Sequence, residues 1–402
     1  MLAPALAATS QALGLLQLIL LFHNVPSGRA SDAYFYLYNW GLLPTQMILL
    51  GVVYPLWLRS VPLGRLRVAR IVAGVSTASG AAALLATFIL VLLGKGYHGI
   101  WLHAALLAGV GAVAAVGWAG ALRSAALGRP AWLSSVTLLS SLFACLALAA
   151  PASNLGDRVT RMCVGLLVGS AVFAVLVILL GTRATRDETL SVVRPGSNEP
   201  GWYLLKSVIG YGAAISLQSM TASLATSSLS SLNIVIKVVS GFSTVVTNTI
   251  LPRLVHSSSS SADDAFGYGW SVLYLASALG LAAGGAEIAL GGRYPALGLI
   301  IAAWILASSL SVSSQRVALR FFPASYSAIS VGAGLVIPLT VGVLSLLGRL
   351  SLSTVLVAYV SLDLVVGVAL SAIMGGRRLA LASAIVASVM TVCGVISLHG
   401  SI

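Results

Sequence analysis

Long apolar runs, each of about 20 residues, recur along the chain with short polar breaks between them. A helix needs roughly 20 apolar residues to cross a hydrocarbon core of about 30 Å. Only 8% of the 402 residues are charged, whereas a soluble globular protein carries roughly 25%. Membrane-spanning strands would show segments of alternating polarity instead. The sequence therefore predicts an all-α, polytopic membrane protein.

The apolar runs predict 12 to 14 transmembrane helices, and thirteen are assigned at the positions that follow. They lie at 4–22, 34–58, 71–93, 99–122, 131–150, 161–181, 203–226, 232–252, 267–288, 295–315, 325–347, 353–375 and 379–398. The first run lacks the basic residues of a signal peptide, so it is assigned as a transmembrane helix.

A charged stretch divides these helices into two sets. We predict an N-terminal six-helix lobe at 1–181, a cytoplasmic linker at 182–202 and a C-terminal six-helix lobe at 203–375. A further transmembrane helix lies at 376–402. Two comparable lobes around a central cavity are typical of transporters built from a duplicated unit.

The basic residues predict the orientation of the chain in the membrane. Loops after odd-numbered helices hold few of them, namely Arg29, Lys95, Arg158, Arg161, Arg293 and Arg349, and loops after even-numbered helices hold more than twice as many. Since cytoplasmic loops are enriched in Lys and Arg, the even loops and the N-terminus are predicted to be cytoplasmic. The net charge of +13 is spread among these loops, so it does not form the clustered footprint of a nucleic-acid binder.

Two short motifs carry a resemblance to a known group. The segment 28–35, Gly-Arg-Ala-Ser-Asp-Ala-Tyr-Phe, precedes and begins the second helix, and 251–254, Leu-Pro-Arg-Leu, ends the eighth. Both resemble motifs of the multidrug/oligosaccharidyl-lipid/polysaccharide exporter superfamily, and in particular of its lipid II flippases and O-antigen type polysaccharide flippases. The resemblance implies two six-helix lobes that expose a central cavity to each side of the membrane in turn.

The sequence departs from the lipid II flippases at the positions where those proteins place cavity arginines. Gln11, Gln17 and His23 stand at these positions on the first helix, and Thr45 and Gln46 on the second. Glutamine can bind a sugar or phosphate oxygen but adds no charge. We therefore expect a different lipid-linked saccharide as substrate, with Gln11, Gln17 and Gln46 as binding residues.

Two ionisable residues lie inside predicted helices, where a charge is costly and usually faces a cavity or a partner. Asp363 is halfway along the twelfth helix, and we predict an ion-coupling role in which it binds Na⁺ or H⁺, as the resemblance implies for this lobe. A structural carboxylate is the alternative. Lys237 in the eighth helix is predicted to meet an anionic substrate or to pair with Asp363, although a lysine can also extend to the interface.

The outer mouth before the second helix holds Arg29 and Asp32. The resemblance assigns them to a gate, and an ordinary helix cap explains Asp32 equally well. Pro44 and Pro338 are expected to distort their helices.

No enzyme motif accompanies these features. The chain lacks a G-x-x-x-x-G-K-[ST] loop, and its histidines and cysteines have no metal-ligand spacing. We therefore expect no catalytic residue, no metal and no cofactor. The prediction is a monomeric flippase in a bacterial cytoplasmic (inner) membrane, with membrane lipids and a polyprenyl-linked glycan as partners. A multidrug/cation antiporter of the same fold is the alternative, and a membrane-embedded glycan polymerase is disfavoured because the outer loops are short.

Overall fold

A computed structural model describes residues 2–25, 28–58, 64–126, 131–151, 155–181, 199–256, 262–290 and 293–400. Within these residues the chain forms two compact units, Met1–Ile234 and Val235–Ile402. Most of the predicted linker, 182–198, lies outside the described residues.

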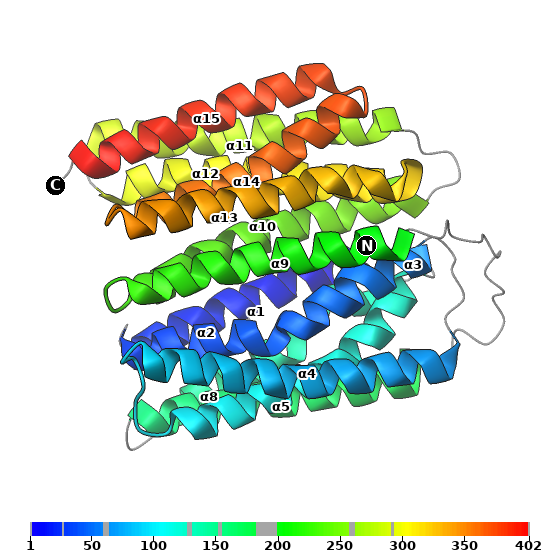
Figure 1. The fold of residues 1–402 in the computed structure, drawn as a ribbon, viewed down its shortest axis with the longest axis vertical. Coiled ribbons are helices and arrows are strands. Elements are labelled where there is room, and N and C mark those ends of the chain that lie inside the picture. Colours follow the sequence, from blue (N-terminus) through cyan, green and yellow to red (C-terminus); the bar gives the residue numbers. More distant parts are fainter. Residues whose placement is uncertain are drawn as a thin grey trace. The chain divides into compact units, whose positions relative to one another are not determined.

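The first unit contains the helices up to α9 and the start of α10. Their bounds are α1 Leu2–Asn24, α2 Arg29–Pro44, the π-helix η1 Thr45–Val53, α3 Tyr54–Leu58, α4 Arg65–Leu92, α5 Ile100–Ala126, α6 Ala131–Ser134, α7 Leu138–Ala149, α8 Leu155–Leu176, the π-helix η2 Val177–Gly181, α9 Glu199–Ser223 and α10 Ser228–His256. Within this unit α5 packs against both α4 and α8, and Figure 1 shows the three running side by side.

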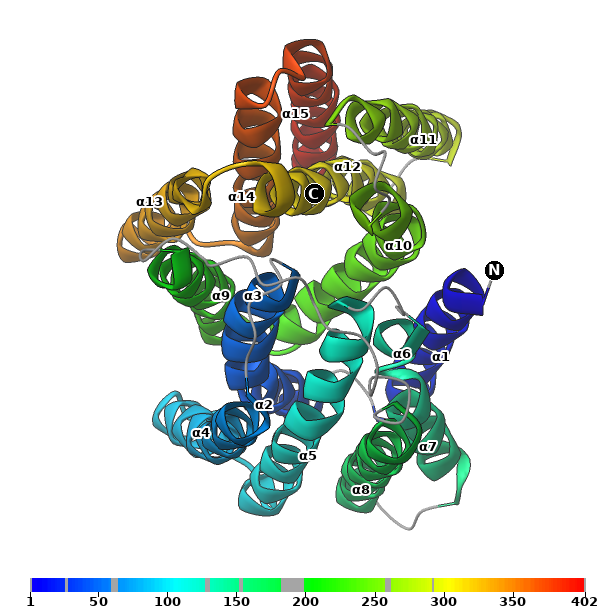
Figure 2. The same ribbon diagram turned by 90° about the vertical axis from the view of Figure 1, so that its right-hand side faces the viewer.

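The second unit contains the rest of α10 and the helices that follow. Their bounds are α11 Ala262–Leu290, α12 Arg293–Phe321, the 3₁₀ turn η4 Ala324–Tyr326, α13 Ser327–Leu346, α14 Leu352–Ile373 and α15 Arg377–Gly400. α12 packs against α11, α14 and α15, as Figure 2 shows. It is the most buried of the candidate spans in the described chain, since 72% of the residues in its most apolar segment are buried, against 28–44% in the other spans.

The prediction of an all-α polytopic membrane protein is confirmed. When continuous segments such as α2, η1 and α3 are joined, and α6 and α7 are counted as one helix across the turn at 135–137, the described residues form thirteen helices, one for each predicted range. Eleven of them are long and apolar enough to cross a membrane. The described residues also expose large apolar side chains, including Leu346 at 89%, Leu281 at 78% and Leu66 at 76%. Such exposure is unusual on a soluble surface and suits contact with lipid.

Small residues allow close helix approach in both units, as is common between membrane helices. A Cβ placed on Gly111 of α5 would lie 2.2 Å from the carbonyl oxygen of Gly41 on α2. A Cβ on Gly367 of α14 would lie 2.8 Å from the backbone nitrogen of Ser311 on α12. Larger residues at these two positions would force the helix backbones apart.

The two prolines have different outcomes. Directly after Pro44 the hydrogen-bond ladder changes to the π-helix η1, a change associated with functional sites. α13 continues through Pro338 as one α-helix.

The division into two six-helix lobes stays a prediction, since the compact units are defined by packing contacts rather than by repeated helices.

Candidate functional site

One face of α2 carries three polar residues in a row: Asp32, Tyr36 and Asn39. Their spacing of four and three residues places them above one another on a helix. In the first unit, each of the three forms hydrogen bonds with α9 or with the beginning of α10. We call this set of contacts the α2 seam.

Asp32 is the most connected residue of the α2 seam. Its Oδ2 accepts the backbone N–H of Ser227 at 2.8 Å. Its Oδ1 accepts the backbone N–H of Ser230 at 2.9 Å and the Ser230 hydroxyl at 2.5 Å. The side chain is only 4% exposed. Hydrogen bonds to an ionised acceptor are short and about twice as strong as neutral ones, so this carboxylate fixes the start of α10 to α2.

The position of Asp32 also suits the dipole of α10, because a helix N-terminus carries partial positive charge. The backbone around this contact is strained. Ser227 has a φ of 79°, and among the described residues it is the one non-glycine with positive φ. This conformation costs an L-residue roughly 1–2 kcal/mol, and the Ser227 N–H points to Asp32 in that conformation. Strain held by a specific contact is common at segments that switch.

The other end of the same turn is held by a cation. The Lys95 ammonium donates to the Leu224 carbonyl at 2.7 Å, directly after α9 ends, where positive charge is favoured. The α4–α5 loop that carries Lys95 is itself anchored, because the Tyr97 hydroxyl bonds to His103 Nδ1. Burial raises the pKa of Tyr97 above its usual value. The turn at 224–227 is therefore fixed by an acid at one end and a base at the other.

Further along α2 the seam consists of neutral groups. The Tyr36 and Ser219 hydroxyls are 2.8 Å apart. The Asn39 amide donates to Gln218 Oε1 at 3.0 Å and to Asn233 Oδ1 at 2.8 Å. These hydrogen bonds join three helices through side chains that water or a polar ligand can equally satisfy.

The seam continues along η1. The Ser207 hydroxyl of α9 donates to the Met47 carbonyl at 2.6 Å, and Gly51 provides the space for this contact. Gln46 and Lys206 adjoin these two residues in sequence. Both side chains are half-buried, and among the described residues neither side chain forms a hydrogen bond or an ion pair.

The other residues predicted for the first unit have varied surroundings. Gln17 is buried, and its amide donates to the Tyr34 hydroxyl at 3.1 Å. Gln11 is half-buried and has no hydrogen-bond partner in the described part of the chain. Arg29 is exposed and does not pair with Asp32. The substrate role of the glutamines and the gate role of Arg29 stay predictions.

In the second unit, Asp363 lies between α12 and α14. Its Oδ2 accepts the Trp304 indole N–H at 2.9 Å, and the Ser311 side chain is a second hydrogen-bond partner. The Trp304 ring packs against Tyr359 with centroids 4.9 Å apart. The described residues place no cation against this carboxylate, so the expected pair with Lys237 is not formed.

Lys237 is half-buried in α10. Its carbonyl accepts the Ser240 hydroxyl at 3.3 Å, but its ammonium, like that of Lys206 in the first unit, has no hydrogen-bond or ion-pair partner among the residues described. The described carboxylates Asp32, Asp157, Glu199 and Asp363 all have partners. α9 and α10 therefore each carry an unpaired ammonium, although neither is among the eleven helices of the described chain that are long and apolar enough to cross a membrane.

Sequence reasoning missed several residues that the structure brings to these sites. They are Asn39, Lys95, Lys206, Gln218, Ser227, Ser230, Asn233 and Trp304. Asn39 and Asn233 are polar residues within apolar runs, which is a signal that could have found them. Ser227 and Lys95 stand in ordinary polar breaks, and nothing in the sequence distinguishes them.

The fold is similar to that of several solved membrane proteins. The eukaryotic MATE transporter AtDTX14 matches with a TM-score of 0.55 at 10% identity, over 96% of this chain and 97% of that one. The lipid II flippase MurJ, in an inward closed conformation, matches with a TM-score of 0.50 at 12% identity, over 97% and 95%. A MATE protein in complex with Br-NRF matches with a TM-score of 0.51 at 13% identity, over 99% and 95%.

Comparisons with protein-family models and with curated protein sequences give no match. The structural matches extend over nearly the full length of each chain, and they include both MATE transporters and a flippase. The chain therefore has the fold of the multidrug/oligosaccharidyl-lipid/polysaccharide exporter superfamily.

Proposed function

We propose that this protein is a flippase that moves a polyprenyl-linked saccharide across a bacterial inner membrane by alternating access, with its N-terminus in the cytoplasm. The single observation that carries the proposal is the unpaired ammonium in each of α9 and α10. The Lys206 and Lys237 side chains are half-buried, and their ammonium groups have no partner among the described residues. A buried ammonium without an acid is costly, and an anionic substrate would offset that cost.

A diphosphate between a saccharide and a lipid tail carries negative charge, which is what an unpaired lysine ammonium requires in a partner. The free amides of Gln11 and Gln46 are suited to the sugar, since an amide both donates and accepts hydrogen bonds. Gln46 and Lys206 adjoin the same contact between η1 and α9. A substrate that reaches this contact can meet a cation and an amide together.

The α2 seam is the proposed outer gate. It is made of hydrogen bonds that water can replace, so it can open without exposing a large apolar surface. Asp32 would hold the turn at 224–227 when the gate is closed. Opening would separate Asp32 from Ser227 and Ser230 and release the strained backbone of Ser227.

Asp363 is the proposed coupling residue. Its carboxylate has protein donors, no cationic side chain of the described residues lies against it, and carboxylate and hydroxyl oxygens are groups that bind hard cations. Replacing Asp363 by Asn should keep the Trp304 contact and abolish the dependence of transport on an imposed ion gradient. Unchanged gradient dependence in Asp363→Asn would contradict this role.

The test of function uses the full chain in liposomes that contain a fluorescent polyprenyl diphosphate-linked saccharide. Protection of the fluorophore from a membrane-impermeant quencher measures translocation. We expect Lys206→Gln and Lys237→Gln each to lower the initial rate about tenfold, the effect of losing one charge-assisted hydrogen bond. Arg67→Gln removes an exposed charge at the start of α4 and should leave the rate unchanged.

A multidrug/cation antiporter is the second candidate, and the MATE transporters among the structural matches favour it. The same liposomes, loaded with a fluorescent organic cation, distinguish the two. Gradient-driven movement of the cation with no movement of the lipid-linked saccharide would overturn the flippase and establish the antiporter.

A further inference from the structure

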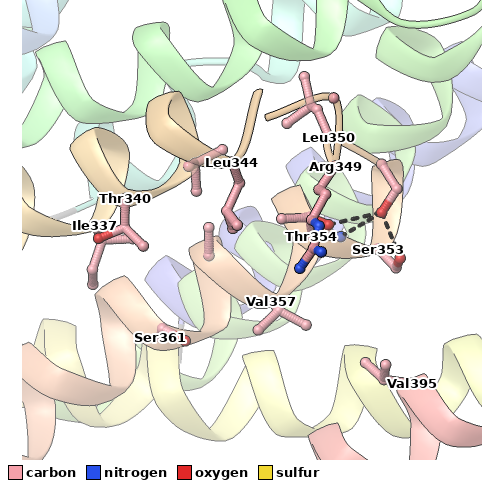
Figure 3. A pocket seen from close by; sticks show the side chains of 14 residues that line it. Ile337, Thr340, Leu344, Arg349, Leu350, Ser353, Thr354, Val357, Ser361 and Val395 are labelled. Atoms are coloured by element: carbon pink, nitrogen blue, oxygen red, sulfur yellow. Dashed lines mark hydrogen bonds between the residues drawn. The ribbon is translucent and has the colours of Figure 1, made fainter. Parts of the chain in front are cut away.

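A second site lies in the second unit, and Asp363 does not line it, although Ser361 at one end is two residues from Asp363 in sequence. Between α13 and α14 there is a cavity of about 670 Å³, which Val395 of α15 also lines. Figure 3 shows the cavity with the α13–α14 turn at one end. Its volume falls within the range of ligand sites, roughly 300–1,000 Å³.

The polar groups gather at the turn. Arg349, Ser351, Ser353 and Thr354 all line the cavity there. The Ser351 hydroxyl is hydrogen-bonded to the hydroxyls of Ser353 and Thr354, at 2.9 and 2.8 Å. The Arg349 guanidinium points into the space between the two helices (Figure 3), and the described residues give it neither an ion pair nor a hydrogen bond. Arginine with no acid nearby is suited to binding a phosphate through two parallel hydrogen bonds.

The rest of the cavity is mostly apolar and extends along the helices. It runs from the turn to Ile337 on α13 and to Ser361 on α14, past Val341, Leu344 and Val357. Each end position is nine residues from its helix terminus, which is about 14 Å at 1.5 Å per residue. Half of a hydrocarbon core is about 15 Å thick. The cavity therefore has the depth of one membrane leaflet.

A soluble anion would leave these walls without a partner, and a neutral lipid would leave Arg349 without one. The ligand must carry a negative group at the interface and an apolar chain below it. The lining contains no Asp or Glu, so nothing balances the amine of a zwitterionic headgroup. We propose that this cavity binds an anionic glycerophospholipid of the surrounding bilayer, with its phosphate at Arg349 and one acyl chain along α13 and α14.

The test places the full chain in nanodiscs that contain equal amounts of phosphatidylglycerol and phosphatidylethanolamine. Native mass spectrometry then counts the lipids retained after the nanodisc is removed. We expect one phosphatidylglycerol to be retained per chain. In Arg349→Gln its occupancy should fall about tenfold, as expected for loss of a bidentate charged contact. Arg378→Gln, which removes an exposed charge at the start of α15, should retain it.

A second variant tests the chain-binding part of the site. Ser361→Phe fills the deep end of the cavity and leaves Arg349 in place, so it should also lower retention of phosphatidylglycerol. Equal retention in the wild type, Arg349→Gln and Ser361→Phe would overturn the proposal, and so would equal retention of the two lipids by the wild type.

Two competitors identify the source of the phosphate. Millimolar inorganic phosphate should not displace phosphatidylglycerol, because it cannot fill the apolar walls. An equimolar polyprenyl phosphate should also leave it bound. Displacement by inorganic phosphate would overturn the proposal and show a simple anion site. Displacement by the polyprenyl phosphate would also overturn it and show a site for the transported lipid. Loss of transport without loss of lipid binding would affect the proposed function alone.

Discussion

Two carboxylates, one buried in the first unit and one half-buried in the second, are held in different ways. Asp32 in the first unit accepts three hydrogen bonds, two of them from backbone N–H groups of a turn and the start of α10. Asp363 in the second unit lies in the middle of α14 and is held by the side chains of Trp304 and Ser311. The first contact joins helix ends, and the second joins two helices along their length.

The surroundings of the two acids differ in the same way. Beside Asp32 the backbone is strained at Ser227, and the neighbouring contacts are hydrogen bonds between side chains. Near Asp363 the backbones of α12 and α14 are in close contact at Gly367. In the proposed mechanism Asp32 therefore belongs to a joint that separates, whereas Asp363 belongs to a closely packed helix pair and would bind an ion without helix movement.

The largest effect should follow from Asp32→Ala. The substitution leaves two backbone N–H groups and a hydroxyl without their acceptor, so the free energy of unfolding in detergent should fall by about 3 kcal/mol. Translocation should fall to background, because the proposed gate cannot close. The matched control is Asp157→Ala, since Asp157 is a partly exposed acid in the first turn of α8 that pairs with Arg161 at 2.9 Å. Its loss should cost about 0.3–0.5 kcal/mol. Equal effects of the two substitutions would remove the special role of Asp32.

The sequence predicted much of the fold and part of the site, and the reason is physical. Apolar runs of spanning length identify helices directly, so each predicted range corresponds to a helix. Asp363 could also be found, because a carboxylate inside an apolar run is conspicuous. The partners of Asp32 could not be found. Ser227 and Ser230 are nearly 200 residues away, and their contribution is mainly backbone N–H, which every residue type but proline provides.

The next effect tests the rigidity of the second region. A methyl group in Gly367→Ala would lie 2.8 Å from the Ser311 backbone nitrogen and 3.0 Å from Leu310 Cγ. Because backbone atoms cannot rotate away, we expect a loss of about 1–3 kcal/mol in the free energy of unfolding. Gly332→Ala in α13 is the control, since nothing lies within 4 Å of its added carbon. That substitution should be neutral or stabilising by up to about 1 kcal/mol. A tolerated Gly367→Ala would show that α12 and α14 can separate.

A smaller effect is expected from Trp304→Phe. Phenylalanine keeps an aromatic ring against Tyr359 but loses the N–H that donates to Asp363. A hydrogen bond to a charged group contributes about 1.5–3 kcal/mol, and Ser311 remains to offset part of the loss. We expect about 1.5 kcal/mol lower stability and a changed ion concentration for half-maximal transport. Trp101→Phe, at a side chain that is 56% exposed, should change neither quantity. An unaltered ion dependence in Trp304→Phe would mean that the indole only packs.

The smallest effect, and one of opposite sign, should come from Ser227→Gly. Glycine adopts the φ of 79° without steric cost and keeps the N–H that Asp32 accepts. The relieved strain is roughly 1–2 kcal/mol, and the greater freedom of glycine in the unfolded chain returns about 0.5–1 kcal/mol. The free energy of unfolding should therefore rise by about 0.5 kcal/mol. Ser240→Gly, at an exposed position within α10, should instead lower it by about 0.5 kcal/mol, since serine is the better helix former. If strain at Ser227 helps the joint to open, Ser227→Gly should also translocate more slowly although it is more stable, and a faster variant would show that the strain has no part in gating.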